Sequence, residues 1–364
     1  MHCWKSLSGR SGDSVADVPG TITLFLAGDV MTGRGVDQTL PHPGGPALRE
    51  SYIKDARDYV ALAEERNGPI PRPTDFHRPW GAALAVLDDT APDARIVNLE
   101  TSVTVSRDYA RHKEIHYRMH PANLGVLAAA RIDVCALANN HLLDFGRRGL
   151  TETLDALTGA GLGYTGAGRD DAEAWQPART GRVLVWSVGA RSSGIGSADA
   201  ATPSRPGVAL LPDLSATTAD RLTGRIATLR ILGDIVVVSV HWGSNWGFSV
   251  PRAQVDFARR LVDGGVDVVH GHSSHHPRPV EIYRGRLVLY GCGDLINDYE
   301  GIGGYEEYRG DLRALYLPVL DADSGELREL RVVALRSRRM RLERATSEEE
   351  RWLRAALDLG DAHP

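Results

Sequence analysis

Short apolar runs rich in β-branched residues alternate with segments of helical spacing through most of the chain. The apolar runs cover residues 21–27, 94–99, 132–138, 182–188, 234–240 and 266–270. None of them alternates cleanly between apolar and polar positions, which is typical of strands buried on both faces of a sheet. The helix-like segments lie between these runs, at residues 80–88, 121–130, 149–160, 219–232 and 252–263. Strands and helices in alternation predict an α/β fold built of layers.

The pattern changes after His270. Strand-like segments follow at residues 279–283, 286–290, 312–320 and 327–335. The turn-like sequences at 283–285 and 321–325 predict hairpins, so this part of the chain is expected to be antiparallel. Residues 347–359 have helical spacing, and Ser347 is a candidate N-cap of this last helix.

The division of the chain follows from the same pattern. Residues 1–20 are rich in Gly, Ser and Asp and predict a loose tail. Residues 21–340 are expected to form a single domain, followed by a C-terminal helix and tail at 341–364. Residues 41–80 look like an insertion, with proline- and glycine-rich flanks around a helix-like stretch at 47–65. Such an insertion is either a surface excursion or a lid or wall of a substrate site.

Composition excludes several classes of protein. Apolar residues make up 42% and charged residues 24%, which is ordinary for a soluble globular protein. The net charge of −5 argues against a nucleic-acid binder held by a basic surface. No stretch approaches the roughly 20 apolar residues of a membrane span. The cysteines (Cys3, Cys135 and Cys292) are far apart and offer neither a disulfide framework nor a paired metal site. A cytoplasmic, reduced protein is therefore expected.

Residues that can bind metals follow one strand after another. They are Asp29, Glu100, Asn140 with His141, His241, and the pair His272 and His275. In open α/β sheets the ligand binds at the carboxyl ends of the strands, so these side chains are expected to converge there. Carboxylates and imidazoles suit divalent ions such as Zn, Mn or Fe. Two ions that share a bridging carboxylate activate a water between them.

Each residue taken alone has an ordinary explanation. Asp29 could serve a turn, and His241 could be a satisfied core histidine. The four histidines at 270, 272, 275 and 276 are harder to dismiss, because the chain has only 13 histidines in 364 residues. His270 still lies within a strand and is expected in the core, whereas His276 is expected to contact a metal ligand or to be exposed. The constellation as a whole favours a metal site.

Five motifs carry a resemblance to a known family. They are GDVMTGR (28–34), NLET (98–101), ANNHLLDFG (138–146), HWG (241–243) and the segment 271–298 beginning GHSSHH. In this order and spacing they resemble the CapA family of capsule-synthesis, poly-γ-glutamate-associated proteins, which are related to calcineurin-like metallophosphoesterases. The resemblance covers roughly residues 21–320. It implies a four-layer α/β/β/α sandwich with mixed sheets.

The resemblance also implies roles for the residues. Asp29 and His275 would bind a first metal ion and Glu100 would bridge to a second. Asn140, His241 and His272 would hold that second ion. His141 corresponds to the catalytic histidine of the superfamily, and Asp144 would orient its ring.

The chain departs from the family pattern around this site. No histidine accompanies Asp29, and Asn245 and Trp246 lie where a glutamate often follows HWG. Ser274 replaces a proline, and Asp294 lies where asparagine is common. Relatives are often anchored to the membrane at the N-terminus, and no such anchor is apparent in this sequence. These differences leave the substrate open.

Further polar residues lie close to the predicted site. Arg34 is either a ligand for a phosphate or carboxylate of the substrate or an ordinary surface arginine. Residues 111–120 carry three histidines and three basic residues, and either face the site and bind an anion or are solvated. A polar wall is expected from Asp294, Asn297, Asp298 and Tyr299.

The sequence therefore predicts a metal-dependent hydrolase with a dinuclear site and a bridging hydroxide. Its substrate would be an anionic small molecule or peptide, cleaved at a phosphate ester or a γ-glutamyl or other peptide-type amide. His141 would stabilise charge and protonate the leaving group. The alternative is a non-catalytic component of capsule or poly-γ-glutamate assembly. A nucleotide-binding protein is disfavoured, because no phosphate-binding loop motif is present and the glycine-rich residues 159–168 follow a helix.

Overall fold

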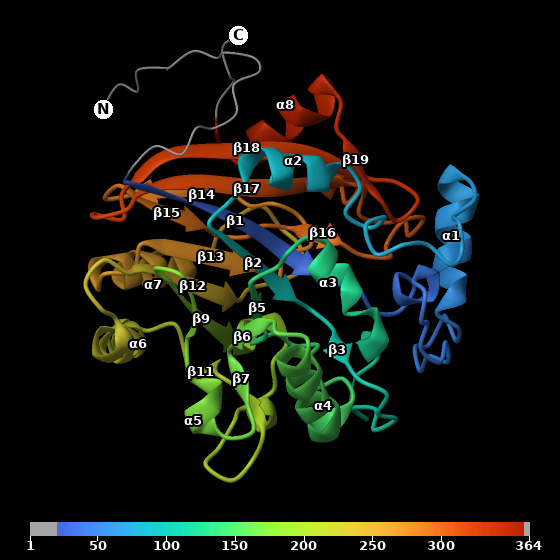
Figure 1. The fold of residues 1–364 in the computed structure, drawn as a ribbon, viewed down its shortest axis with the longest axis horizontal. Helices are drawn as coiled ribbons and strands as arrows, with labels where there is room; N and C mark the ends of the chain where they lie inside the picture. The colour runs from blue at the N-terminus through green and yellow to red at the C-terminus, as the bar shows by residue number, and fades with distance from the viewer. Residues whose placement is uncertain (1–19, 112, 360–364) are drawn as a thin grey trace.

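Two mixed β-sheets face each other, with helices on their outer faces (Figure 1). The computed structural model describes residues 20–111 and 113–359. Apart from Gly20, the tail predicted for residues 1–20 lies outside this range. Among the described residues, no helix has the length and apolarity needed to cross a bilayer.

Within residues 20–111 and 113–359, the first sheet has eight strands. Its path is β19 (Leu342–Arg344), β18 (Leu327–Ser337), β17 (Leu312–Asp321), β1 (Thr21–Val30), β2 (Ala94–Leu99), β5 (Val134–Ala136) and β6 (Gly163–Thr165), and β16 (Asp294–Ile296) also pairs with β1. The strands from β1 to β6 run parallel, whereas β17, β18 and β19 are antiparallel. β19 extends this sheet beyond residue 340.

The second sheet has seven strands in the described part of the chain. Its path is β11 (Leu210–Leu211), β9 (Val183–Ala190), β12 (Ile235–His241), β13 (Val268–His272), β15 (Arg286–Leu289) and β14 (Val280–Tyr283), with β8 (Ala178–Thr180) paired to β9. β14 and β15 form the hairpin expected at 283–285, and β17 and β18 form the one expected at 321–325.

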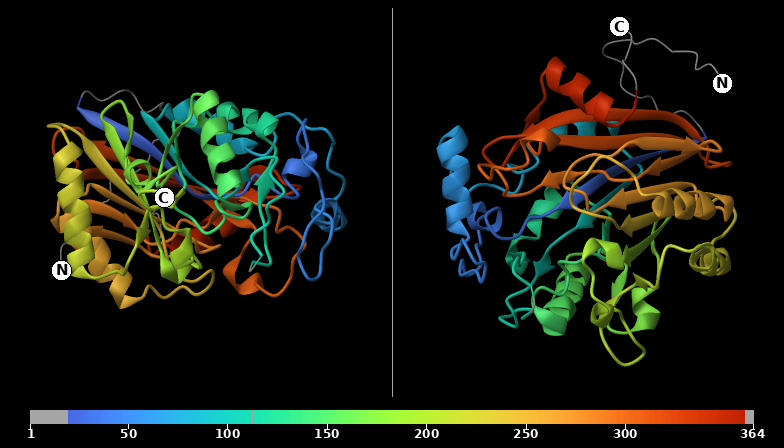
Figure 2. Two further views of the ribbon diagram at one scale, coloured as in Figure 1. Left: turned by 90° about the horizontal axis from the view of Figure 1, so that it is seen from below. Right: turned by 180° about the vertical axis from the view of Figure 1, so that it is seen from behind.

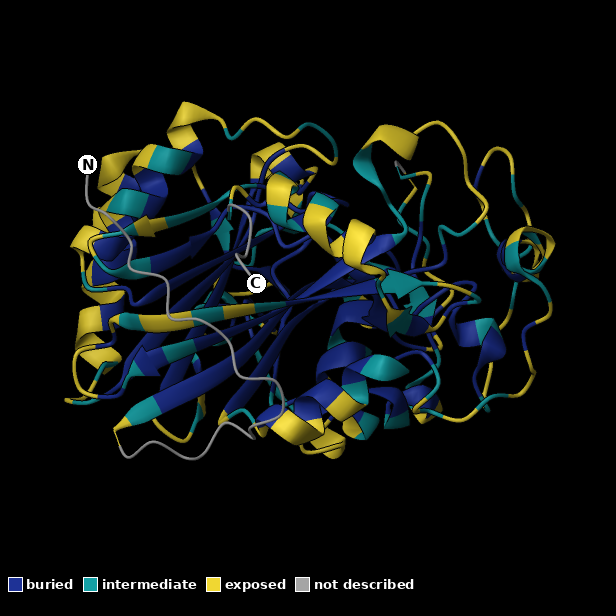
Figure 3. Ribbon diagram, turned by 90° about the horizontal axis from the view of Figure 1, so that it is seen from above, coloured by how far each residue is buried: buried dark blue, intermediate teal, exposed yellow. Residues whose placement is uncertain are grey.

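Three apolar clusters hold the four layers together. Between the sheets, alternate residues such as Leu24 and Ile96 pack against Val185 and Val237. The opposite face of the first sheet packs on α2 (Ala82–Thr90), α3 (Gly125–Ala129) and α4 (Gly146–Gly159). The outer face of the second sheet packs on α6 (Ala216–Leu229) and α7 (Arg252–Asp263). Figure 3 shows the result, with buried strands inside and exposed residues on the helices and outer loops. The predicted α/β/β/α sandwich with mixed sheets is confirmed.

The remaining elements are short or lie at the edges. They are β3 (Ser102–Val103) with β4 (Arg118–Met119), β7 (Ala167–Gly168) with β10 (Gly207–Val208), α5 (Asp171–Ala174), α1 (Arg57–Asn67) and α8 (Ser347–Ala356). The views in Figures 1 and 2 place α1 at one end of the molecule, beside the loops that precede it.

Two local predictions were wrong. The helix-like stretch at 47–65 is helical only from Arg57, because the preceding backbone folds back on itself: Leu48 donates to Lys54 and Ala56 donates to Pro46. The N-cap of α8 is Thr346, not Ser347. Thr346 accepts a hydrogen bond from the amide of Glu349, whose carboxylate accepts one from the amide of Thr346. This reciprocal pair satisfies two amides that Ser347 could not reach together.

Candidate metal centre

The carboxyl ends of strands from both sheets meet at one buried site. β1 lies between β2 and β16 in parallel register, so Asp29 is paired with Asn98 on one side and with Asp294 on the other. In the second sheet, the register of β12 and β13 pairs His241 with His272. Potential ligand atoms within 4.8 Å of one another form two groups, Asp29–His241–His272 and Asp29–His275–Asp294. Asp29 is thus shared between two triads of buried side chains.

Hydrogen bonds orient the two histidines of the second sheet. His272 Nε2 lies 2.8 Å from the Ser239 hydroxyl, which leaves Nδ1 facing the centre. That Nδ1 atom lies 2.8 Å from Nδ1 of His241, and the opposite nitrogen of His241 lies 3.0 Å from Oδ1 of Asn140. The predicted ligands Asn140, His241 and His272 are therefore brought together.

Glu100 lies directly after β2, on the other side of the centre. Its Oε1 atom lies 3.7 Å from Nε2 of His141 and 3.9 Å from Nε2 of His241. The amide nitrogen of Asn98 donates to Asp29 Oδ1 at 2.7 Å and to Glu100 Oε2 at 3.0 Å, so one side chain holds both carboxylates. Glu100 is not a member of either triad, but it adjoins both Asp29 and the histidines.

Burial penalises the negative charge of the carboxylates at this centre, and a bound cation would offset that penalty. Burial, followed by the charge of Asp294, raises the pKa of Asp29 to about 7. Burial and the nearby Asp29 raise the pKa of Glu100 well above its usual range, and burial lowers the pKa values of His241 and His272. Oδ2 of Asp29 is buried and has no hydrogen-bond partner among the described residues. Carboxylates and neutral imidazoles crowded away from water fit divalent metal ions, which would satisfy them.

His141 is held at the edge of the centre by a polar network. Its Nδ1 atom lies 2.7 Å from Asp144 Oδ2, and that oxygen also accepts a bond from the amide of Tyr117. Lys113 donates to Asp144 Oδ1 at 2.6 Å and to the carbonyl oxygen of Asn140. Burial lowers the pKa of His141 to about 4, partly offset by Asp144. The ring of Tyr117 packs edge-on against His141, 4.5 Å away.

Lys113 and Tyr117 therefore bring part of the segment 111–120 to the site, and binding of an anion by this segment stays a prediction. Lys113 and Tyr117 were not singled out as individual site residues, because a loop without a clear element gives no basis for placing one side chain. Asn98 was also missed, although it lies within the NLET motif. Asp294 was expected in a polar wall and instead completes one of the two triads.

A cleft of about 990 Å³ opens onto the centre, with His275 and Asp294 among its lining residues. Trp246, Tyr299 and Arg313 line its walls. The insertion contributes Tyr52, Tyr59, Arg66 and Asn67 to the lining. Residues 41–80 were expected to form either a surface excursion or a lid or wall of a site. The position of these side chains matches a wall of the cleft.

Arg34 is buried among the protein's own carboxylates. Its Nε and Nη2 atoms donate to Asp298 at 2.8 and 2.6 Å, and Nη1 donates to Glu50 at 2.8 Å. Its guanidinium also lies over the ring of Tyr59, 3.6 Å from the centroid. Arg34 thus joins β1 to the insertion and to the end of β16.

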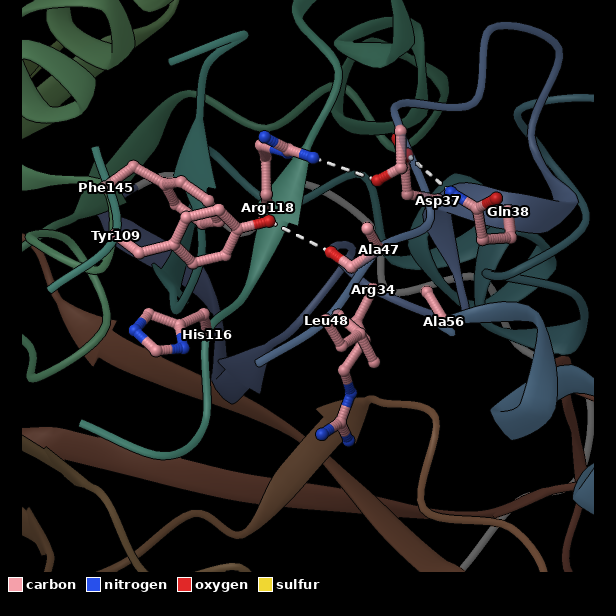
Figure 4. A pocket seen from close by; sticks show the side chains of 11 residues that line it. Arg34, Asp37, Gln38, Ala47, Leu48, Ala56, Tyr109, His116, Arg118 and Phe145 are labelled. Carbon is pink, nitrogen blue, oxygen red and sulfur yellow. Dashed lines mark hydrogen bonds between the residues drawn. The ribbon is translucent and has the colours of Figure 1, made fainter. Parts of the chain in front are cut away.

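Figure 4 shows a small cavity that is lined by Arg34 and by residues of the insertion. Its volume is about 10 Å³, so it can hold one water at most. Tyr109 donates to the carbonyl of Ala47 at 2.9 Å, and Arg118 donates to that of Gly45 at 2.9 Å. The start of the insertion is therefore fastened to the segment that carries Lys113.

Two histidines of the cluster lie outside the triads. His270 is in the core, as expected, with Nε2 2.9 Å from the carbonyl oxygen of Ala27. His276 is only 1% exposed and stacks against Trp246 and Tyr308, so it is not a surface residue.

The fold and the site define a two-sheet α/β/β/α protein with a buried carboxylate–imidazole centre at its strand ends. Residues 23–299 match the family model described as bacterial capsule synthesis protein PGA_cap, and the chain belongs to this family. The resemblance to CapA proteins predicted from the motifs is thereby confirmed.

The chain is also similar to individual proteins. The chain is 52% identical over 350 residues to a probable polyglutamine synthesis accessory protein of Mycobacterium tuberculosis strain H37Rv, covering 94% of this chain and 92% of that protein. It is 30% identical to the PGA biosynthesis protein CapA of Bacillus subtilis strain 168, covering 76% of this chain and 63% of that protein. It is also similar to the crystal structure of a phosphatase from Mycoplasma pneumoniae, with 12% identity, a TM-score of 0.44 and coverage of 91% of this chain and 96% of that one.

Proposed function

We propose that this PGA_cap protein is a metal-dependent hydrolase with a dinuclear centre. The observation that carries the proposal is the pair of buried triads that share Asp29, one of which reaches the cleft through His275 and Asp294. Asp29, Glu100, Asn140, His241, His272 and His275 are the proposed ligands. Divalent ions bound there would supply a water of lowered pKa and positive charge to offset the charge that develops during the reaction.

The chain's own residues would position the reactants and move a proton. Asp144 and Lys113 hold the Nδ1 side of His141, which turns Nε2 toward Glu100 and the centre. Because burial lowers its pKa to about 4, the ring is neutral near pH 7. It would accept at Nε2 a proton released by the attacking water and then donate that proton to the leaving group. Arg34, whose donors are engaged by Asp298 and Glu50, would position the cleft wall and not bind substrate directly.

The proposed substrate is an anionic small molecule or peptide. Six arginines and four carboxylates line the cleft, and this excess of positive charge favours anionic groups. A phosphate ester and a γ-glutamyl or other peptide-type amide both suit a carboxylate–imidazole centre. The names of the mycobacterial and Bacillus relatives, which refer to polyglutamine synthesis and PGA biosynthesis, favour the amide.

A second candidate is an accessory role without catalysis. The mycobacterial relative, which matches nearly the whole chain, is named an accessory protein. In this case the cleft would bind a polymer or a partner of the synthesis machinery, and the centre would serve binding or stability.

A hydrolysis screen separates the two. Protein loaded with Mn²⁺ or Zn²⁺ is incubated with p-nitrophenyl phosphate, bis(p-nitrophenyl) phosphate, γ-glutamyl-p-nitroanilide and a γ-glutamyl oligomer. The hydrolase proposal predicts metal-dependent turnover of one class, reduced by about 10²–10⁴-fold in His141→Asn. Binding of the γ-glutamyl oligomer without turnover would favour the accessory role. Equal turnover by wild type and His141→Asn would contradict the proposed mechanism.

A further inference from the structure

We infer that Asp294 is itself a metal ligand and that it makes the two positions of the centre chemically unequal. The inference rests on the proposed metal centre and concerns which residues fill its first position. That position would include Asp29, Asp294 and His275, and the second would include Asp29, His241 and His272.

The backbone brings Asp294 to the centre through strand pairing. β16 runs parallel to β1, with Asp29 opposite Asp294 and the amide of Asp29 donating to the carbonyl of Gly293 at 3.1 Å. The strands are so close that a Cβ atom on Gly28 would lie 1.9 Å from that carbonyl oxygen. Because parallel neighbours present paired residues at the same end of the sheet, the two carboxylates are held together by the fold.

Hydrogen bonds fix the orientation of Asp294. Its Oδ2 atom accepts a bond from Asn297 Nδ2 at 2.6 Å, and Asn297 Oδ1 accepts one from the buried Arg313 at 2.9 Å. Its Oδ1 atom lies 2.9 Å from Nδ1 of His275. The carboxylate is therefore anchored on one side by a relay that ends in a buried guanidinium.

A second, independent observation points to a cation between the carboxylates. Oδ2 of Asp29 is buried and has no partner within the described part of the chain. Residues 28–41 contain no histidine, so the strand end that carries Asp29 supplies no imidazole for this position. A buried, unpaired carboxylate oxygen beside a second carboxylate is costly unless a cation joins them.

The two positions would then prefer different metals. With Glu100 shared between both positions and Asn140 at the second, the first offers three carboxylates and one imidazole, and the second offers two carboxylates, two imidazoles and one amide oxygen. Carboxylate oxygens suit harder ions such as Mn²⁺, whereas imidazoles suit Zn²⁺. One Zn²⁺ ion at the second position and one Mn²⁺ ion at the first is the arrangement that this donor set favours.

Sequential metal loading tests the inference without reference to turnover. Metal-free protein receives one equivalent of Zn²⁺ and is then titrated with Mn²⁺ by calorimetry, with bound metals counted by mass spectrometry. Wild type should bind one ion of each. Asp294→Asn, which is the same size, should keep Zn²⁺ and bind Mn²⁺ at least tenfold more weakly, whereas His241→Asn should lose Zn²⁺ and keep Mn²⁺. A Kd for Mn²⁺ within twofold of wild type in Asp294→Asn would overturn the inference.

A crystal structure of the loaded wild type gives a second readout, which separates direct metal binding by Asp294 from a role in orienting His275 through its hydrogen bond alone. Direct contact between an Asp294 oxygen and the ion supports the inference, and an ion held without that oxygen overturns it. The experiments distinguish a failure of this inference from a failure of the proposed function. Normal loading with no cleavage of any ester or amide would defeat the hydrolase proposal alone. Cleavage by wild type with unchanged loading of Asp294→Asn would defeat the ligand assignment alone.

Discussion

Lys113 shows how a single residue outside any regular element can complete a site. Its side chain, 26% exposed, bridges Asp144 and the backbone carbonyl of Asn140, and thereby links the proposed proton carrier to a proposed ligand. A charge-assisted hydrogen bond of this kind fixes ring orientation without contacting substrate.

Lys113→Met should therefore lower kcat by about 10- to 100-fold, with KM changed little, because His141 loses its support while the cleft is preserved. Steady-state kinetics on the substrate found in the screen measures this. Lys113→Arg keeps the charge and should recover much of the rate. Wild-type kcat in the methionine variant would show that the contact has no catalytic consequence.

Arg34 is a second single residue with a predicted effect. Its replacement should lower the stability of the fold and not the rate of a reaction. Removing one partner of a buried ion pair leaves an uncompensated charge, so Arg34→Met should lower the free energy of unfolding by about 3–5 kcal/mol. Arg148 forms an exposed pair with Glu152 and serves as the control, with an expected loss of less than about 0.5 kcal/mol in Arg148→Met. Urea unfolding of both variants gives the comparison, and equal losses would refute the buried network.

At the level of elements, the strand and helix pattern was predicted well where an element is long and buried on both faces. β1, β2, β9, β12 and α7 lie close to their expected ranges. The short strand β16 was not predicted, because three residues carry no period and their pairing is decided by tertiary contacts. The role of Asp294 was missed for the same reason, because Asp29, its partner in the strand pairing, lies far away in the sequence.

The capping pair at α8 gives a prediction of its own. Thr346→Ala should cost about 1 kcal/mol of stability, since the amide of Glu349 loses its acceptor. Ser347→Ala should change stability by only a few tenths of a kcal/mol, because Ser347 is the first helical residue and not the cap. Thermal unfolding of the two variants tests this, and the reverse order of effects would restore the original expectation.

The close approach of β1 and β16 can be tested in the same way. Gly28→Ala would force a methyl group to within 1.9 Å of the carbonyl oxygen of Gly293, so the strands must separate, at a cost of about 1–3 kcal/mol. Gly159→Ala, at the end of α4 where no atom of the described residues lies within 4 Å of the added atom, is the matched control and should be neutral or slightly stabilising. Equal stability of Gly28→Ala and wild type in urea would contradict this strand packing.

At the scale of the molecule, the sandwich brings together residues that are far apart in the chain. The rule that ligands bind at the carboxyl ends of strands was enough to anticipate Asp29, Glu100, His241, His272 and His275, and the structure brings all five side chains to one place. This rule could not predict the distances between these side chains. It also could not predict that both triads would share Asp29 and not Glu100. Those features depend on how two sheets face each other, which no local pattern records.

The central claim is that this fold builds a dinuclear metal centre. The most direct test is the metal content of the purified protein by mass spectrometry, measured for wild type and for His241→Ala. We predict about two divalent ions per chain in wild type and a loss of one or both in the variant. No bound ion in wild type, even after addition of Mn²⁺ or Zn²⁺, would contradict the account and leave the accessory role as the better explanation.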